Sequence, residues 1–467
     1  MGQMLMHRIH SPKRNGWWFA IIAAIACATS SSVQAQSGDA LIDKLVEKGI
    51  LTTDEANGLR DEVDKGFTQA YQVKTGMPDW VTSLKLSGDL RSRYEGFFSD
   101  NSQFAERNRF RYRLRAGFTA VLKDDFEVAF RLTSSEPSGS FGGDPVSGNT
   151  TLSGNGSKKF IYLDLAYVKW APLHEKDWNV STTFGKMENP FTFPSSLVFD
   201  KDYTPEGLAA DVSYRFDEHQ TLRWTGGAFA LNELRDTTKD AYMYGTQLRL
   251  NSVWSKQISS SLGAGFFGLQ NPSFLVGKPP KPTDALATDQ VPDQQRGNSR
   301  DAAGNLLYEY NPIYIDAALT YAFESAPFYT GPFPITVAGD FLHNPAVSEK
   351  NEGYSMGIHF GKAGKKKTYE VAYRFIELQA DAWYEETTES DFGAFYEGAP
   401  VGGRAGYGAG TNVRGHVVKL SYSPYDQLTL ALTLFLTHLI DESPARPISV
   451  DSNSDMKRLQ VDAVWRF

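Results

Sequence analysis

Residues 107–120 read Arg-Asn-Arg-Phe-Arg-Tyr-Arg-Leu-Arg-Ala-Gly-Phe-Thr-Ala, and this stretch decides the fold. Apolar side chains occupy the even positions from Phe110 to Ala120, while arginines occupy the odd positions from Arg107 to Arg115. A helix would scatter both sets around its axis, whereas a strand places them on opposite faces. The stretch therefore predicts a β-strand with one apolar face and one charged face.

The same alternation recurs along the chain and predicts sixteen strands. They are expected to begin near residues 83, 107, 125, 159, 177, 208, 220, 241, 257, 312, 332, 353, 367, 413, 427 and 456. The connections alternate in length. Short ones (123–125, 217–219 and 424–426) separate long ones (135–158, 188–207, 271–311 and 379–412). Short turns at one end and long loops at the other are typical of an outer-membrane barrel.

A soluble β-sandwich would also alternate, because it too buries one face of each strand. Three features favour a barrel instead. The apolar faces run about ten residues, which suits tilted strands crossing a bilayer. The opposite faces are densely charged, as a water-filled lumen requires. The chain also ends on a strand carrying Trp465 and Phe467, which resembles the signal read by the barrel-assembly machinery. We therefore expect an all-β fold, a transmembrane antiparallel up-and-down β-barrel over residues 79–467.

The N-terminus has the features of an export signal over residues 1–35. Arg8, Lys13 and Arg14 precede an apolar run over 17–28, and Val33-Gln34-Ala35 forms a small-residue cleavage site. The run is too short to span a bilayer as a helix, which takes about 20 residues. A lipoprotein box ending at Cys27 is the alternative, but it lacks the usual leucine. Cys27 is the only cysteine, so the mature chain would carry none, which suits passage through an oxidising periplasm.

Residues 36–78 have helical periodicity rather than alternation. Gly49 ends one predicted helix, and Thr52-Thr53-Asp54-Glu55 forms a capping box that opens the next. We expect a short periplasmic helical hairpin and linker. Cleavage after Ala35 removes three Lys/Arg and no acid, so the formal charge changes from −8 to −11. We do not expect such an acidic chain to bind nucleic acid, which is itself negatively charged.

Two segments resemble the bacterial putative porin family, a relative of the phosphate-selective porins O and P. They read Thr-Phe-Gly-Lys-Met-Glu-Asn-Pro-Phe over 183–191 and Val-Phe-Asp-Lys-Asp-Tyr-Thr-Pro-Glu-Gly over 198–207. The hairpin at 45–59, the segments at 378–382 and 389–392, and Gly415-His416 follow the same order. The resemblance implies a sixteen-stranded passive channel in the bacterial outer membrane, surrounded by lipid and assembled as a homotrimer. It carries over no phosphate preference.

A porin passes small hydrophilic solutes or ions by supplying water and polar walls across the hydrocarbon, without a cofactor. Its selectivity depends on the narrowest cross-section and the charges there. The predicted pore-lining basic residues are Arg91, Arg93, Arg107, Arg109, Arg111, Arg113, Arg115 and Arg131. We expect the loop over 188–207 to fold into the lumen and to face them as a constriction with four acids, Glu188, Asp200, Asp202 and Glu206.

Two alternatives concern these same charges. The arginines could instead pair with wall acids such as Asp89 and Glu127, which would leave the lumen neutralised. Asp200, Asp202 and Glu206 could also bind Ca²⁺, which favours carboxylate oxygens.

Other functions for the whole barrel have weaker support. A barrel hydrolase would need a nucleophile and a base, yet no Gly-x-Ser-x-Gly element accompanies His343, His416 or His438. A plugged transporter needs 22 strands and a globular plug, for which the chain is too short. An adhesin or receptor would use the long loops over 271–311 and 379–412, and such binding could coexist with a pore.

Overall fold

The computed structural model describes residues 77–138, 142–233, 239–275, 297–301, 304–396, 406–442 and 453–467. The chain divides into two units, residues 1–76 and residues 77–467. The predicted signal peptide and the predicted helical hairpin, up to Gly76, lie outside the described residues.

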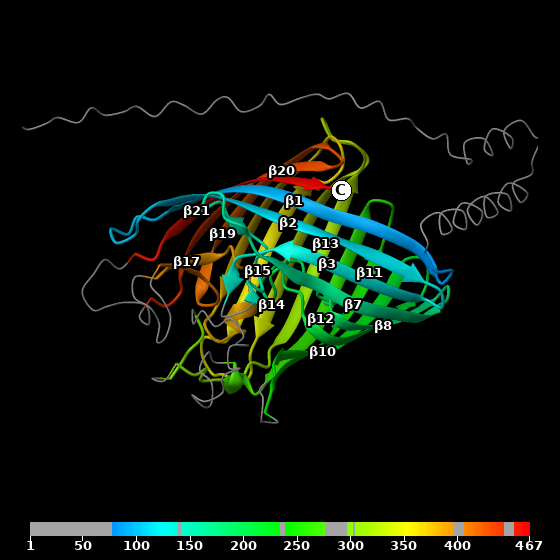
Figure 1. Cartoon of the computed structure of the whole chain (residues 1–467), viewed down its shortest axis with the longest axis horizontal. Coiled ribbons are helices and arrows are strands. Elements are labelled where there is room, and N and C mark those ends of the chain that lie inside the picture. Colours follow the sequence, from blue (N-terminus) through cyan, green and yellow to red (C-terminus); the bar gives the residue numbers. More distant parts are fainter. Residues whose placement is uncertain are drawn as a thin grey trace, which may run out of the picture. The chain divides into compact units, whose positions relative to one another are not determined.

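The second unit is a closed antiparallel barrel of sixteen strands (Figure 1). Each strand pairs with the next along the ring, and the last strand, β21, pairs with β1 from Asp89↔Arg466 to Phe98↔Lys457, which closes the ring. The strands are β1 (Val81–Phe98), β2 (Arg107–Leu122), β3 (Phe126–Ser134), β7 (Ile161–His174), β8 (Trp178–Lys186), β9 (Glu206–Arg215), β10 (Gln220–Asn232), β11 (Ala241–Val253), β12 (Ile258–Gln270), β13 (Ile313–Phe323), β14 (Phe333–His343), β15 (Glu352–Gly361), β16 (Thr368–Leu378), β19 (Val413–Tyr425), β20 (Leu428–Leu439) and β21 (Met456–Arg466).

The predicted strand number and order are confirmed, and each predicted strand start lies within two residues of the observed one. The turn between β2 and β3 shows why the short connections were recognisable. Asp124 and Asp125 both adopt positive φ, 59° and 62°. Aspartate tolerates this left-handed conformation better than most residues, so the three residues 123–125 suffice to reverse the chain.

The two faces of the strands differ as the alternation predicts. On β2, the side chain of Phe110 is 60% exposed on the outside of the ring, whereas Arg111 and Arg113 are 7% and 6% exposed on the inside. Apolar residues such as Leu86, Leu208 and Met356 are likewise exposed on the outer face of their strands. No helix in the described part of the chain is long and apolar enough to cross a bilayer.

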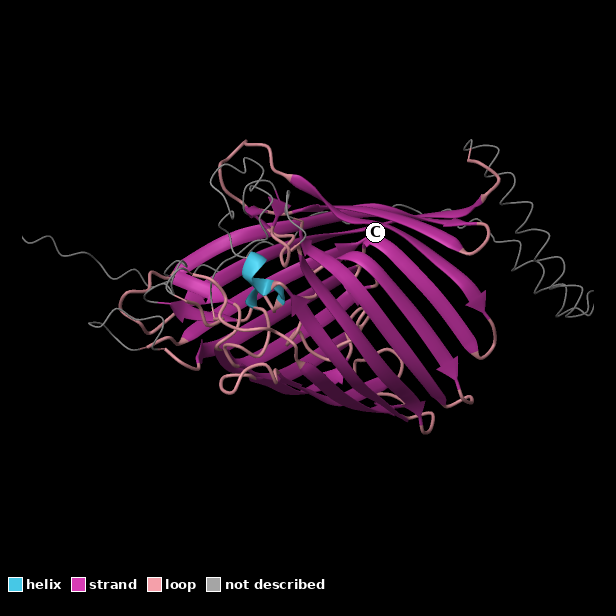
Figure 2. Ribbon diagram, turned by 90° about the horizontal axis from the view of Figure 1, so that it is seen from below, coloured by secondary structure: helices cyan, strands magenta, loops and turns pink. Residues whose placement is uncertain are grey.

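The long connections carry short elements of their own, some of which lie within the ring of strands (Figure 2). These elements are β4 (Pro137–Ser138), β5 (Gly142–Gly143), β6 (Thr150–Thr151), β17 (Gly393–Tyr396), β18 (Gly406–Ala409) and the 3₁₀ turns η1 (Pro272–Phe274) and η2 (Glu385–Thr387). Two connections matter most for the interior. We call residues 187–205, between β8 and β9, inner loop 1, and residues 379–396, after β16, inner loop 2.

An apolar cluster joins both inner loops to the wall. Phe199 of inner loop 1 and Trp383 of inner loop 2 pack on Phe267 of β12, with ring centroids 5.7 and 6.2 Å from it. The cluster also includes Phe229 of β10 and Phe435 of β20, which stand far apart around the ring. Loop residues can join strands so far apart only from inside the barrel. The two loops therefore fill part of the lumen with an apolar core.

Candidate functional site in the barrel interior

The register between β1 and β2 sets the order of charges on the inner wall. Asp89 stands opposite Arg115 and Glu95 opposite Arg109, and between them arginine faces arginine at Arg91↔Arg113 and Arg93↔Arg111. Each end of the patch thus has a wall acid, while its centre has four neighbouring guanidinium groups. Such a centre needs further acids from elsewhere, because unpaired like charges in a half-buried wall repel one another.

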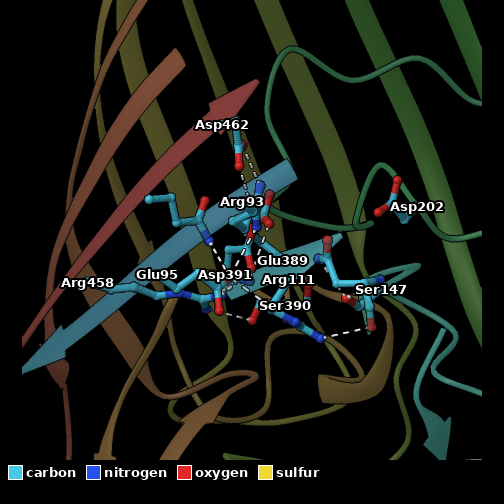
Figure 3. A network of polar contacts seen from close by, with 12 residues as sticks. Arg93, Glu95, Arg111, Ser147, Asp202, Glu389, Ser390, Asp391, Arg458 and Asp462 are labelled. Atoms are coloured by element: carbon cyan, nitrogen blue, oxygen red, sulfur yellow. Dashed lines mark hydrogen bonds and ion pairs between the residues drawn. The ribbon is translucent and has the colours of Figure 1, made fainter. Parts of the chain in front are cut away.

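The first group of acids gathers around Glu95, which is fully buried (Figure 3). Its carboxylate accepts hydrogen bonds from Arg458 of β21 at 2.8 Å, from Arg93 at 3.3 Å and from Arg109. Asp462 of β21 binds Arg93 with both oxygens, at 2.7 and 2.8 Å. The seam between the first and last strands is therefore cross-linked by charge.

Inner loop 2 joins this seam through Asp391. Its carboxylate lies 2.9 Å from Arg93 and 2.6 Å from Arg458. Burial opposes ionisation of Asp391, but Arg458 and Arg93 outweigh it and hold the pKa of this carboxyl well below its usual value. A charged Asp391 therefore ties the loop to two adjacent strands.

Inner loop 1 reaches the other half of the patch through Asp202. Arg113 donates to Asp202 at 2.6 and 2.9 Å and to Asp89 at 3.0 Å, and Arg115 donates to Asp89 at 2.7 Å. Burial opposes ionisation of Asp202, but Arg113, Arg91 and Arg115 lower its pKa overall. Arg113 thus binds a wall acid and a loop acid at once, and a constriction formed by these charges stays a prediction.

Inner loop 1 crosses from one side of the ring to the other. Its Thr192 carbonyl accepts hydrogen bonds from Gln247 at 2.8 Å and Arg249 at 2.6 Å, both on β11. Its Pro194 carbonyl accepts a hydrogen bond from Arg374 of β16 at 2.9 Å, and its Asp202 carboxylate accepts hydrogen bonds from Arg113 of β2. Contacts with β2, β11 and β16 require that the loop lie within the lumen.

The four predicted loop acids do not act as one group. Glu188 contacts Arg131 of β3. Asp200 has other partners than the arginines. Its carboxylate accepts hydrogen bonds from the backbone N–H groups of Asp202 at 2.7 Å and Ser390 at 2.8 Å. The contact with Ser390 joins the two inner loops. Glu206 is the first residue of β9 rather than a loop residue, and it binds Lys186 at 2.9 Å.

This arrangement also argues against the calcium alternative. Asp202 is committed to Arg113 and Glu206 to Lys186, so their carboxylates do not converge with that of Asp200. Across the residues that the structure describes, no group of three His, Cys, Asp or Glu side chains is placed to hold a metal ion.

The remaining predicted arginines have different surroundings. Arg91 donates to the Asn149 side chain at 2.7 Å, and Arg111 donates to the Asn149 carbonyl at 3.1 Å. Arg131 is shared between Asp164 of β7 and Glu188. Arg107 is exposed at the start of β2. It therefore stands at the rim of the patch rather than within it.

Sequence reasoning missed the acids and the arginine that complete the patch. Glu95, Asp391, Asp462 and Arg458 were not among the predicted site residues. Arg458 and Asp462 were already recognisable as inward-facing from the alternation on the last strand. Asp391 gave no such signal, because a loop residue has no strand face to indicate its direction.

The C-terminal aromatics lie where the final strand meets the first. Trp465 and Phe467 are exposed on the outside, at 41% and 67%. The backbone of Phe467 exchanges hydrogen bonds with Gly88 of β1, at 2.8 and 3.1 Å. Their recognition during assembly stays a prediction.

Two cavities border inner loop 1 along β3, β7 and β8. The first, of about 590 Å³, is lined by Arg115, Asp164, Lys186 and Asp202 among others. The second, of about 310 Å³, includes Glu188 in its lining, together with Glu127, Lys169, Asp211 and Arg223. Both signs of charge line each cavity.

Gly263 of β12 lies beside Arg249, which donates a hydrogen bond to the Thr192 carbonyl of inner loop 1. A substitution at Gly263 therefore tests how this loop is held. Arg249 and Asp316 stand on the flanking strands and pair across this glycine, at 2.6 Å. A Cβ at position 263 would lie 2.1 Å from Asp316 and 2.6 Å from Arg249. We expect Gly263→Ala to destabilise the barrel by about 1–3 kcal/mol, as overpacking does. Urea unfolding in lipid measures the loss.

The control for this prediction is a double-mutant cycle. In an Asp316→Ala background the added methyl group has no ion pair to displace, so Gly263→Ala should cost much less. An equal cost in both backgrounds would locate the strain elsewhere on β12.

A family model described as "Putative porin" matches residues 100–300. No curated protein matches the sequence. Among solved structures, the high-pH structure of Pseudomonas putida OprB is similar with a TM-score of 0.49 and 12% identity, covering 86% of this chain and 97% of that chain. The channel DcaP of Acinetobacter baumannii is similar with a TM-score of 0.41 and 9% identity, covering 82% and 97%.

Proposed function

We propose that this protein is a porin of the bacterial outer membrane, which lets small hydrophilic solutes or ions diffuse passively through its lumen. The observation that carries the proposal is the closed ring of sixteen strands, apolar outside and charged inside. Lipid can solvate the outer face, and water can solvate the inner face. The family match over residues 100–300 favours the same conclusion, and favours a channel over an enzyme.

We also propose how the barrel assembles and which residues narrow its lumen. Folding by the barrel-assembly machinery would use Trp465 and Phe467, and assembly into a homotrimer would follow the porin pattern. A kinship with phosphate-selective porins rests on the order of the motifs at 183–191 and 198–207. The basic residues of β1, β2 and β3 would form the constriction together with Glu188 and Asp202 of inner loop 1.

The alternatives meet specific obstacles. An adhesin would present its long loops outward, but inner loop 2 buries Trp383 and Tyr384 inside the ring. A hydrolase would need a histidine beside a nucleophile. His416 instead stacks on Tyr373, a residue of the outward face. The two also share a hydrogen bond, with 2.8 Å between the His416 Nδ1 and the tyrosine oxygen.

Planar-bilayer recording of the purified, detergent-solubilised protein tests the proposal. We expect stepwise, voltage-independent conductance increments when protein is added to one side. Folded protein that inserts into the bilayer without conducting would overturn the proposal. A preparation that stays folded and monodisperse without detergent would overturn the membrane location.

We expect the ion preference of the channel to depend on pH because of Asp144. It lies in the loop between β5 and β6 and lines the first cavity. Burial raises the pKa of Asp144 to about 6, only partly offset by the N–H of Val146 and by Arg111. Its carboxyl is neutral at pH 5 and charged at pH 7, so raising the pH adds a negative charge to the cavity. We expect the reversal potential under a KCl gradient to shift toward cation preference over this range.

Asp144→Asn removes that titration while keeping the side-chain size. The shift between pH 5 and pH 7 should then shrink. A variant that retains the full shift would assign it to another carboxyl.

A further inference from the structure

One ion pair lies between the linings of the two cavities beside inner loop 1, and the side chains of Arg131 and Glu188 in this pair are 19% and 55% exposed. The guanidinium of Arg131 contacts Asp164, which lines the first cavity, and Glu188, which lines the second. Lys186 lines the first cavity and the next residues of the chain line the second. The Arg131–Glu188 pair therefore links the linings of two polar spaces along the same wall, and we call it the partition.

A bulge in β7 helps to place this partition. Arg131 pairs with Leu165 and Leu132 with Leu163, so Asp164 is the extra residue left without a strand partner. A bulge re-aims a side chain out of the strand's regular alternation. Here Asp164 binds Arg131 from one side and leaves the other side of the guanidinium to Glu188.

Within the described part of the chain, buried contacts fill the lumen on two other sides. Toward β1 and β21, the groups around Glu95 and Asp391 are almost fully enclosed, with Arg458 only 1% exposed. Toward β12, the cluster of Phe199, Phe267 and Trp383 fills the space. Breaking a buried pair or an apolar core costs far more than breaking an exposed pair.

The Glu188 side chain is 55% exposed, although the chain on either side of it is fixed. Met187 is 2% exposed and its N–H donates to the Pro205 carbonyl at 3.0 Å, while Phe191 is 6% exposed within the apolar cluster. Glu188 can therefore swing away from Arg131 without moving the loop.

We infer that solutes cross the lumen along β3, β7 and β8, and that the Arg131–Glu188 pair is a gate that favours small zwitterions. This inference rests on the proposed function. A zwitterion can bind Arg131 with its carboxylate and Glu188 with its ammonium group, so both gate residues keep a partner while the gate is open. An anion or a cation alone compensates only one of them. The mixed charges of both cavities extend this pattern along the route.

Liposome swelling with alanine and with glycerol, which are similar in size, tests the gate. For the natural protein we expect alanine to enter faster than glycerol. Glu188→Gln should abolish that advantage and leave glycerol entry equal or faster. The matched control is Glu175→Gln, an exposed acid in the turn between β7 and β8, which should leave both rates unchanged.

A second measurement locates the route independently of solute preference. Glu188→Cys should make the single-channel conductance sensitive to a charged methanethiosulfonate reagent, whereas Glu175→Cys and the natural protein should stay insensitive. If the channel conducts but modification at 188 changes nothing, or if Glu188→Gln keeps the alanine advantage, the gate is refuted. If the natural protein does not conduct at all, the proposed function itself fails.

Discussion

Replacing Glu95 by Gln should destabilise the barrel more than any other single change to its charged interior. The fully buried carboxylate of Glu95 is shared by Arg93, Arg109 and Arg458, and Arg111 lies 3.8 Å away. The amide would leave these guanidinium groups without their central anion. Removing one partner from a buried ionic group costs about 3–5 kcal/mol, because the remaining charges stay desolvated.

The measurement is the urea midpoint of unfolding in lipid vesicles, followed by tryptophan fluorescence. Glu206→Gln is the control, because its side chain is 64% exposed and, among the described residues, pairs with Lys186 alone. Exposed pairs of this kind contribute about 0–1 kcal/mol. If both variants unfold at the same urea concentration, the cluster at the strand seam contributes no special stability.

Replacing Trp383 by Ala should have the largest effect on the open area of the pore. Trp383 is fully buried and packs against Phe199 of inner loop 1 and Phe267 of β12, so it joins the two inner loops to each other and to that strand. Truncating a buried tryptophan costs about 3–5 kcal/mol through lost contacts and the cavity left behind. Loss of that packing loosens inner loop 2 from β12, while Asp391 still holds it to β1 and β21, and we expect a larger and noisier single-channel conductance.

Trp254→Ala is the matched control, since this tryptophan is 62% exposed at the turn between β11 and β12. Its removal should leave the conductance unchanged. A Trp383→Ala channel with the conductance of the natural protein would mean that inner loop 2 does not limit the open area.

The limits of prediction differ between the wall and the loops. The partners of Arg113 show this difference. The contact with Asp89 follows from the pairing of adjacent strands, whereas the contact with Asp202 depends on the path that inner loop 1 takes through the lumen. Asp200 and Glu206 were grouped with Asp202 from their proximity in sequence. The structure separates them: one joins the two loops and the other begins a strand.

Sequence alone determined the ring. Each strand records its two environments as alternating side chains, and a one-residue slip would send every arginine of β2 into lipid, so the order and faces of the strands can be read locally. Tertiary structure alone decided what fills the ring. Asp391 meets Arg93 across 298 residues of sequence, and Trp383 packs on Phe199 of the other inner loop. Loops carry no periodic signal, and the partners that hold them become neighbours only when the barrel closes.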